Sequence, residues 1–282
     1  MDIRRLRKIF KQWHRAPQIY AASRHCHNWL SLSAAYVGFV RLHYPCTALF
    51  KSGAVVRLEN DFDLRTFWRI FFADEYPVTD RDERIIDAGA NCGFFTLYAT
   101  MRSRAQLVSI EPFRPTFGRL RENTAPVANR VTLIHAALQG HDGITYIDAR
   151  SNIASQFRRI VENEGDPVNA ISLDSLLRQC GWDRVDLLKM DIEGSEFDAI
   201  LRASPEVLSR IGRISMEFHP RDGYAPDAII EHLRNNGFQL TSLRDDGDGY
   251  GVAHFTNHGY GSRGYAKALT AADSAPQVAG RV

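Results

Sequence analysis

From residue 84 onward the chain alternates short apolar runs with amphipathic helical patterns, and this alternation limits its possible folds more than any other feature. Strands that alternate with helices form βαβ units, which build a mostly parallel, doubly wound α/β sheet with helices on both faces. The apolar runs predict strands over 84–88, 106–111, 131–138, 185–190, 213–218, 238–243 and 250–256. The helical patterns predict helices over 94–101, 114–124, 173–179, 195–202 and 226–236.

The last two predicted strands are separated only by the Asp- and Gly-rich stretch RDDGDG, residues 244–249. This composition is typical of a hairpin turn, so the sheet is expected to end in an antiparallel edge strand. A six- or seven-stranded, mostly parallel sheet with one terminal hairpin is the usual core of Rossmann-like class I methyltransferases. That comparison is an analogy of fold and says nothing yet about function.

The sequence divides into three parts. Residues 1–80 are expected to form a helical and strand-like N-terminal extension, residues 81–258 the α/β domain, and residues 259–282 a small polar tail that is disordered. The extension includes an aromatic-rich helix, and we assign its aromatic side chains to packing rather than to a ligand site. Two segments, 30–80 and 151–167, are candidates to build a pocket for a second substrate.

The charge and the cysteine content limit which binding partners and which cellular location are expected. The net charge is +2, and beyond residue 30 the 32 acidic residues outnumber the 28 basic ones, which argues against nucleic acid. The first 30 residues carry seven Lys or Arg and one Asp, so they could touch an anionic membrane peripherally, although a solvated basic helix face is the simpler interpretation. The four cysteines lack CxxC or metal-finger spacing, which is typical of reduced thiols in a cytoplasmic protein.

The segment RIIDAGANCGFFTLYAT, residues 84–100, is the most specific local signal. A strand ends near Asp87, a loop carries Gly89, Asn91 and Gly93, and a helix follows at once, which is the usual ligand cradle of an open α/β sheet. The dinucleotide fingerprint fails, because the required glycines at the third and sixth positions fall on Asn91 and Phe94. An acid before the loop repels a pyrophosphate but suits the ammonium and sulfonium groups of S-adenosylmethionine, which Asp87 could hold directly or through water.

The second predicted strand ends in Glu111, followed by Pro112. An acid at this position can accept hydrogen bonds from both hydroxyls of a ribose. Because parallel strand ends meet at one edge, Asp87 and Glu111 are expected to flank the glycine loop. Together they predict an adenosine site for a cationic ligand.

The strings DAGANCGFFT, IEP and LLKMDIEGSE together resemble the FkbM family of S-adenosylmethionine-dependent methyltransferases, over roughly residues 50–257. The family pattern D-x-G-A-N-x-G matches Asp87, Gly89, Ala90, Asn91 and Gly93. The family's ribose acid matches Glu111, and an Asn of the following helix matches Asn123. The resemblance implies S-adenosylmethionine as cofactor and methylation of a hydroxyl on a sugar or a polyketide natural product.

A run of acids stands where the apolar segment LLKM ends: Asp191, Glu193 and Glu196, with Lys189 just before them. Buried carboxylates are costly unless they are paired or used. In an extended strand Lys189, Asp191 and Glu193 point the same way, toward the methyl donor, and Lys189 would keep the acids ionised. Ser195 is expected to cap the next helix, and Glu196 to have a partly structural role at its start.

The following strand ends in MEFHP, which places Glu217 and His219 on one face. Methyl transfer to a hydroxyl needs alignment of the reactants and removal of the hydroxyl proton. The candidates for the base are His219, Glu217 and Asp191, with Lys189 in support. A Mg²⁺ ion held by Asp191, Glu193 and Glu217 is an alternative that could acidify the hydroxyl of a bound diol, and we favour the metal-free mechanism slightly.

The leading hypothesis is therefore an O-methyltransferase for a hydroxyl of a saccharide or polyketide-like small molecule. One alternative keeps the donor and changes the acceptor to a nitrogen or a lipid-linked glycan. Another is a non-catalytic methyltransferase-like module that binds a nucleotide. The sequence contains no signal for the identity of the acceptor or for the oligomeric state.

Overall fold

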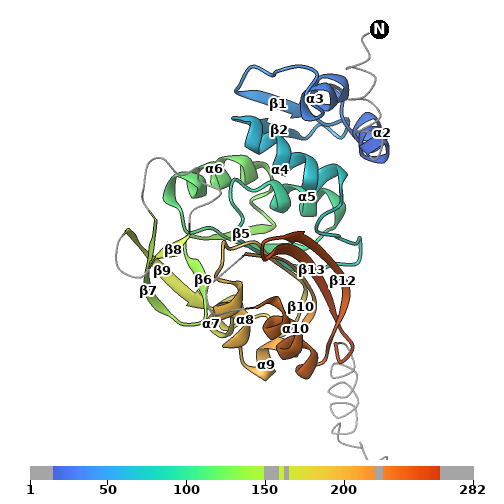
Figure 1. The fold of residues 1–282 in the computed structure, drawn as a ribbon. Helices are drawn as coiled ribbons and strands as arrows, with labels where there is room; N and C mark the ends of the chain where they lie inside the picture. Colours follow the sequence, from blue (N-terminus) through green and yellow to red (C-terminus); the bar gives the residue numbers. More distant parts are fainter. Residues whose placement is uncertain (1–14, 149–158, 162–164, 220–224, 261–282) are drawn as a thin grey trace, which may run out of the picture.

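A computed structural model of the chain describes residues 15–148, 159–161, 165–219 and 225–260 (Figure 1). Its main sheet has seven strands in the order β12-β13-β11-β10-β3-β4-β5. They are β3 (Arg84–Ala88), β4 (Gln106–Ile110), β5 (Val131–Ile134), β10 (Val185–Met190), β11 (Ile211–Phe218), β12 (Phe238–Gly247) and β13 (Tyr250–Asn257). The strands from β11 to β5 are parallel, whereas β13 runs antiparallel to β11 and to β12. The predicted α/β fold with a mixed sheet is confirmed, but the antiparallel strand β13 lies between β11 and β12 and not at the edge.

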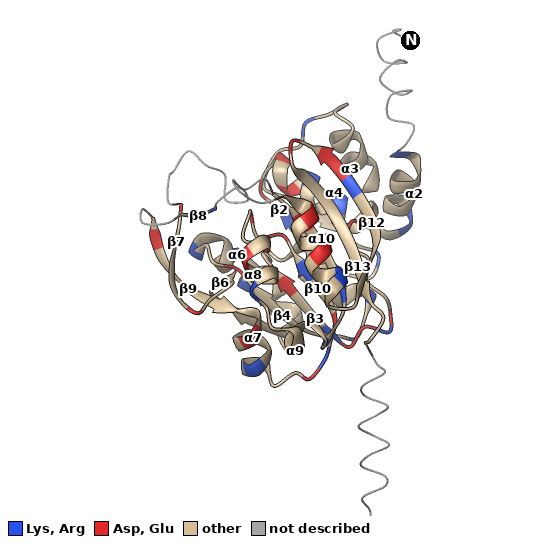
Figure 2. Ribbon diagram, turned by 60° about the horizontal axis from the view of Figure 1, so that its bottom comes forward, with Lys and Arg blue, Asp and Glu red and all other residues tan. Residues whose placement is uncertain are grey.

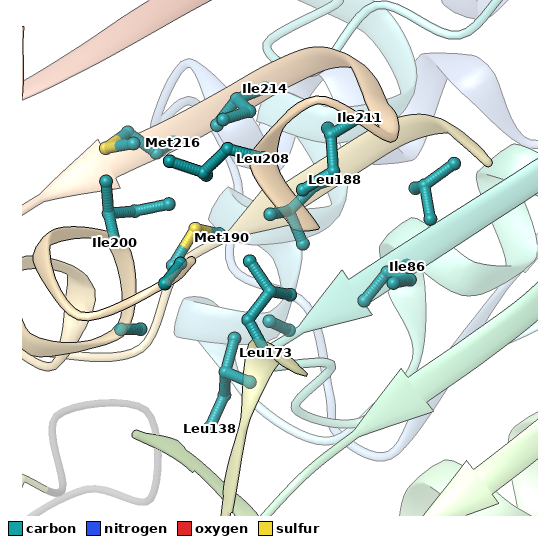
Figure 3. Close-up of a cluster of buried hydrophobic side chains, with 14 of the residues drawn as sticks. Ile86, Leu138, Leu173, Leu188, Met190, Ile200, Leu208, Ile211, Ile214 and Met216 are labelled. Atoms are coloured by element: carbon teal, nitrogen blue, oxygen red, sulfur yellow. The ribbon is translucent and has the colours of Figure 1, made fainter. Parts of the chain in front are cut away.

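The sheet separates two hydrophobic clusters because successive side chains of a strand point to opposite faces. In β3, Ile85 packs into one cluster and Ile86 into the other, and Leu187 and Leu188 of β10 divide in the same way. Figure 3 shows the second cluster, where Ile86, Leu188 and Met190 of the central strands face side chains from the surrounding elements. That face is covered by α7 (Leu173–Cys180), α8 (Glu196–Leu201), α9 (Pro205–Leu208) and α10 (Pro226–Asn235).

The opposite face is covered by α5 (Phe94–Arg102), α6 (Arg114–Thr124) and the N-terminal extension. The extension consists of α2 (Ala16–His25), α3 (Trp29–Tyr36), β1 (Cys46–Leu49), β2 (Val55–Leu58) and α4 (Asp61–Phe72). Asn60 caps α4 by accepting the backbone N–H of Asp63, and Phe67 of α4 packs edge-on to Phe94 of α5. Figure 1 shows the extension, in blue, above α5. The packing role predicted for its aromatics is confirmed for Phe67 and Trp68, which are fully buried, but not for Phe62, which is 48% exposed.

A second, four-stranded sheet was not predicted. It contains β6 (Ala137–Gln139), β7 (Gly143–Ile147), β8 (Ile160–Val161) and β9 (Asp166–Ser172) in the order β6-β9-β7-β8. The single strand predicted over 131–138 is therefore wrong. The chain turns after β5, where the N–H of Ala136 donates to the carbonyl of Ile134, and it then pairs β6 with β9. Apart from the exposed Thr132 and His135, residues 131–138 are apolar, so hydrophobicity alone does not mark the break between β5 and β6.

Charged residues are interspersed along the described elements, with Lys and Arg beside Asp and Glu on both sides of the sheet (Figure 2). Within the described ranges no helix combines the length and hydropathy needed to cross a bilayer. Most of the basic residues of the N-terminus, the predicted polar tail after residue 260, and much of segment 151–167 lie outside the described residues.

Candidate active site

A cavity of about 1260 Å³ opens at the carboxyl ends of β3, β4, β10 and β11. β3 lies between β4 and β10 in the sheet. From β3 the chain continues to β4 on one side, whereas β10, on the other side, comes much later in the chain, so the strand order reverses at β3. Ligands of open α/β sheets bind at such a switch point. The cavity lies where the strand-end motifs were expected to converge.

The loop after β3 forms one wall, and its backbone needs glycine. Gly89 has φ +71°, and a Cβ there would lie 1.7 Å from the carbonyl oxygen of Asp191. Asn91 is also left-handed, with φ +50°. Gly93 begins α5 with φ +89°, and a Cβ there would lie 2.8 Å from Leu120. The loop is thus pressed between β10 and α6, and Gly89, Ala90 and Asn91 face the cavity.

Glu111 follows β4 and is held by the same loop. Its carboxylate accepts the N–H of Asn91 at 2.9 Å and the N–H of Phe113 at 2.8 Å. The side chain is only 7% exposed but contributes to the cavity lining beside Pro112. Burial raises the pKa of Glu111 to about 7, against the opposing effect of the two backbone donors.

Lys189 and Asp87 form a buried ion pair under the loop. The Lys189 ammonium lies 3.1 Å from Asp87 Oδ1 and donates to the carbonyl of Gly89 at 2.8 Å. Asp87 also accepts the hydroxyl of Thr96 at 2.7 Å. Burial alone would lower the pKa of Lys189, but Asp87 and then Asp191 outweigh it and raise this pKa above its usual value. Lys189 lines the cavity, whereas Asp87 is fully buried and does not.

His219, just after β11, stands among three carboxylates. Its Nδ1 is 3.1 Å from Glu196 Oε1, and its Nε2 is 3.6 Å from Glu193 Oε2 and 3.9 Å from Asp191 Oδ1. Glu196 is itself fixed by the backbone N–H groups of Ile192 and Gly194. Burial alone would lower the pKa of His219, but Glu196, Asp191 and Glu193 raise it to about 9.

The turn between β10 and α8 places these acids. The strand ends at Met190, so Asp191 and Glu193 belong to the turn and not to an extended strand as predicted. Glu193 adopts φ +55° and Gly194 φ +99°, which folds the acids back toward His219. The prediction that Ser195 caps α8 is wrong, because its side chain accepts no helix N–H. Its Oγ instead accepts a hydrogen bond from Gln139 Nε2 at 2.7 Å.

Glu217 belongs to a separate group that reaches the extension. It accepts the hydroxyl of Tyr76 at 3.2 Å and the guanidinium of Arg69 at 3.2 Å. Arg69 also pairs with Glu75, which is 4% exposed as a side chain. Sequence reasoning missed Tyr76 and Arg69 because they lie 141 and 148 residues from Glu217. An Arg inside an aromatic helix is the only signal that could have suggested them.

Most of the predicted site residues meet at the cavity. Those that line it are Gly89, Ala90, Asn91, Glu111, Pro112, Lys189, Asp191, Glu193, Glu217 and His219. Asp87 and Gly93 support the wall from behind, and Asn123 anchors the loop by donating from Nδ2 to the carbonyl of Cys92 at 2.7 Å. The two segments predicted to build the acceptor pocket also contribute, with Phe62 and Arg65 from one and Arg159 from the other.

The structure thus combines an α/β fold with a cavity at the carboxyl edge of its mixed sheet. The family described as "Methyltransferase FkbM domain" matches residues 87–240, more than half of the chain. The chain therefore belongs to the FkbM family of methyltransferases, which confirms the resemblance found in the sequence.

Two relatives are similar to part of the chain. The AMB antimetabolite synthetase AmbE of Pseudomonas aeruginosa is 28% identical over a match that covers 58% of this chain and 10% of that protein. The methyltransferase sdnD of Sordaria araneosa is 24% identical, with 57% of this chain and 75% of that protein covered. The chain thus spans a small part of the first relative and three quarters of the second.

Solved structures resemble the chain more remotely. An rRNA methylase from Streptococcus thermophilus is 12% identical with a TM-score of 0.42, over 67% of this chain and 95% of that one. TYW2 from M. jannaschii, in complex with AdoMet, is 13% identical with a TM-score of 0.39, over 77% of this chain and 90% of that one. Similarity at this level says nothing about substrates.

Proposed function

We propose that the chain is an S-adenosylmethionine-dependent O-methyltransferase that acts on a hydroxyl of a saccharide or polyketide-like small molecule. The observation that carries this proposal is that Glu111, the Gly89–Asn91 loop and Lys189 line the same cavity as Glu217 and His219. A donor site and a proton-accepting site thus share one space.

The donor end suits an adenosyl ligand by its chemistry. Glu111 is buried and fixed by two backbone N–H groups, so its carboxylate can accept from the vicinal hydroxyls of a ribose. The absence of a Cβ at Gly89 lets the loop lie against the backbone of Asp191 and leaves its outer side open to a ligand. Asp191 supplies negative charge at the edge, where the ammonium of the amino acid part would bind.

The acceptor end is built from the extension and the second sheet. Phe62 and Tyr76 offer apolar surface, while Arg65, Arg159 and Thr66 offer donors for hydroxyl or carbonyl oxygens. Sugars and polyketides present this mixture of apolar faces and oxygens. The similarity to a protein named an antimetabolite synthetase supports a small-molecule acceptor.

The donor, when bound, supplies an electrophilic methyl group. The acceptor oxygen attacks that methyl carbon, the carbon–oxygen bond forms as the carbon–sulfur bond breaks, and the hydroxyl proton passes to the enzyme. The cavity groups that can accept the proton are Asp191 and Glu217, and His219 only in its neutral form, because its pKa is raised to about 9. The protein's part is to align the oxygen with the methyl group and to take the proton as the bond forms.

The first test is calorimetric binding of S-adenosylhomocysteine, S-adenosylmethionine and NADH to the purified chain. We expect both adenosyl ligands to bind and NADH not to bind. Glu111→Gln should weaken binding at least tenfold, whereas Glu122→Gln, an exposed acid on α6, should leave it unchanged. A folded protein that binds neither adenosyl ligand would refute the proposal.

The second test uses a methyl-labelled donor with a panel of sugar, polyketide, amine and lipid-linked glycan acceptors. We expect label to appear on a hydroxyl oxygen of a sugar or polyketide, with the position read by NMR of the product. Transfer to an amine or only to a lipid-linked glycan would overturn the acceptor class while leaving the donor assignment intact.

A further inference from the structure

We propose that Asp191, Glu193 and His219 form a binding site for one divalent cation, with Mn²⁺ preferred over Mg²⁺, which holds an acceptor oxygen beside the methyl donor. The cation site itself follows from the geometry of these three residues. Its use in catalysis rests on the proposed methyltransferase function, so metal binding and donor binding are tested separately below.

The three side chains bring their ligand atoms together. One carboxylate oxygen of Asp191, one of Glu193 and an imidazole nitrogen of His219 all lie within 4.8 Å of one another. The separations from Nε2, 3.6 and 3.9 Å, are too long for hydrogen bonds. Two ligands of one ion, each about 2.1–2.2 Å from it, lie roughly 3.0–4.4 Å apart, depending on the angle between them. The two separations from Nε2 fit a shared ion better than direct pairing.

The orientation of His219 is the second, independent observation. The side chain is only 4% exposed, and Nδ1 is committed to Glu196 Oε1, so Nε2 is the nitrogen that faces Asp191 and Glu193. A carboxylate behind the imidazole is the usual support of a metal-binding histidine, because it fixes the tautomer and the ring orientation. Glu196 is fully buried and held by two backbone N–H groups, so this support is rigid.

The surrounding charge also favours a cation. Asp191, Glu193 and Glu196 carry three carboxylates around one imidazole. The Arg159 guanidinium has its Nε 3.9 Å from Glu193 Oε2, which is too distant for a hydrogen bond. The Lys189 ammonium is paired with Asp87. Asp191 and Glu193 are 33% and 16% exposed as side chains and line the cavity, so an ion can reach them.

The ligand set favours Mn²⁺ over Mg²⁺ and Ca²⁺. Two carboxylates and one imidazole suit Mn²⁺, which accepts nitrogen and oxygen ligands, better than Ca²⁺, which takes six to eight oxygens. Mg²⁺ is expected to bind more weakly because it prefers oxygen and dehydrates reluctantly. Because Asp191, Glu193 and His219 all line the cavity, an acceptor hydroxyl in that cavity could complete the coordination of a bound ion. With Asp191 and His219 used as ligands, Glu217 is the cavity carboxylate left to take the proton.

This set differs from the Mg²⁺ alternative given in the sequence analysis, which contained Glu217 in place of His219. Glu217 is instead held by Tyr76 and Arg69 on the side of the extension. It therefore provides a matched control, since it is a carboxylate of the same cavity that the proposed site does not use.

The experiment measures Mn²⁺ binding by electron paramagnetic resonance, with chelator-treated full-length protein and no donor or acceptor. We expect one Mn²⁺ per chain, displaced by Mg²⁺ at higher concentration and least by Ca²⁺. Asp191→Asn and His219→Ala should each weaken binding at least a hundredfold, and Glu196→Gln about tenfold to a hundredfold. Glu217→Gln should bind as the wild type does.

Circular dichroism and urea unfolding of the same variants show that they are folded, and calorimetry with S-adenosylhomocysteine on the wild type tests the donor site separately. If the wild type binds Mn²⁺ no more tightly than His219→Ala, or if Glu217→Gln loses the ion as well, the site is wrong. Donor binding without Mn²⁺ binding would overturn the cation site alone. Mn²⁺ binding without donor binding would overturn the proposed methyltransferase function alone.

Discussion

Gly89→Ala tests whether the donor loop depends on close contact with the turn after β10. An alanine Cβ would lie 1.7 Å from the carbonyl oxygen and 2.7 Å from the carbonyl carbon of Asp191. Real Cβ atoms essentially never approach within 3.0 Å, so the loop and the turn must separate by at least about 1.3 Å. Both neighbours are backbone atoms, which cannot move aside as a flexible side chain can.

The expected cost has three parts. A left-handed φ of +71° costs an alanine about 1–2 kcal/mol. Separation of the loop from the turn also breaks two hydrogen bonds. The one from Asp191 N–H to the carbonyl of Ala88 is worth about 1 kcal/mol, and the one from the Lys189 ammonium to the carbonyl of Gly89 is worth about 1.5–3 kcal/mol. The free energy of unfolding should therefore fall by roughly 3.5–6 kcal/mol, a large share of the about 5–15 kcal/mol of a typical domain.

Gly181→Ala is the matched control. Gly181 ends α7 with φ +64°, and a Cβ there meets nothing within 4 Å. It therefore incurs the conformational cost of about 1–2 kcal/mol without the clash. Urea unfolding of both variants gives the two losses of stability, and their difference isolates the contact with Asp191. Equal losses would refute the argument that the loop is pressed against this turn.

The remaining predictions concern charge and hydrogen bonding in the cavity. If the donor needs ionised Glu111, affinity for S-adenosylhomocysteine should rise with pH through about 7 and be about tenfold weaker at pH 6 than at pH 8, while Glu111→Gln shows no such slope in calorimetry. Lys189→Met should lower the free energy of unfolding by about 3–5 kcal/mol because it leaves Asp87 buried and unpaired, and adding Asp87→Asn should restore part of the loss in urea unfolding. Tyr76→Phe should cost only about 1 kcal/mol of stability but reduce methyl transfer at least tenfold through Glu217, so unchanged turnover would contradict a role for that hydroxyl.

The main sheet could be predicted from the sequence because its signals are local. β3 and β10 begin and end at the predicted residues, since each is a short apolar run followed at once by turn residues. The second sheet was missed for the opposite reason. Its strands are short, β6 continues the apolar run of β5, and its pairing with β9 depends on residues about 30 positions away.

The sequence could predict which residues gather at the candidate site, but not which of them contact one another. The motif around Gly89 placed the loop and Glu111 at one edge because parallel strands end together. It could not show that Asp87 points under the loop toward Lys189 and Thr96 rather than into the cavity. Ser195 shows the same limit, because its partner Gln139 lies 56 residues away and no local pattern announces it.

Glu217 and His219 show that a residue's position along a strand does not determine its contacts or its chemical role. Both residues lie at the end of β11 and line one cavity. Glu217 is hydrogen-bonded to Tyr76 and Arg69 of the extension, whereas His219 is hydrogen-bonded to Glu196, which follows the turn after β10. The two residues are therefore controlled by different parts of the chain. If the proton passes to Glu217 and the cation is held at His219, changes in the extension should alter the proton transfer and leave the cation in place. Changes in the turn after β10 should release the cation while the contacts of Glu217 persist, so the two halves of the acceptor chemistry can be removed one at a time.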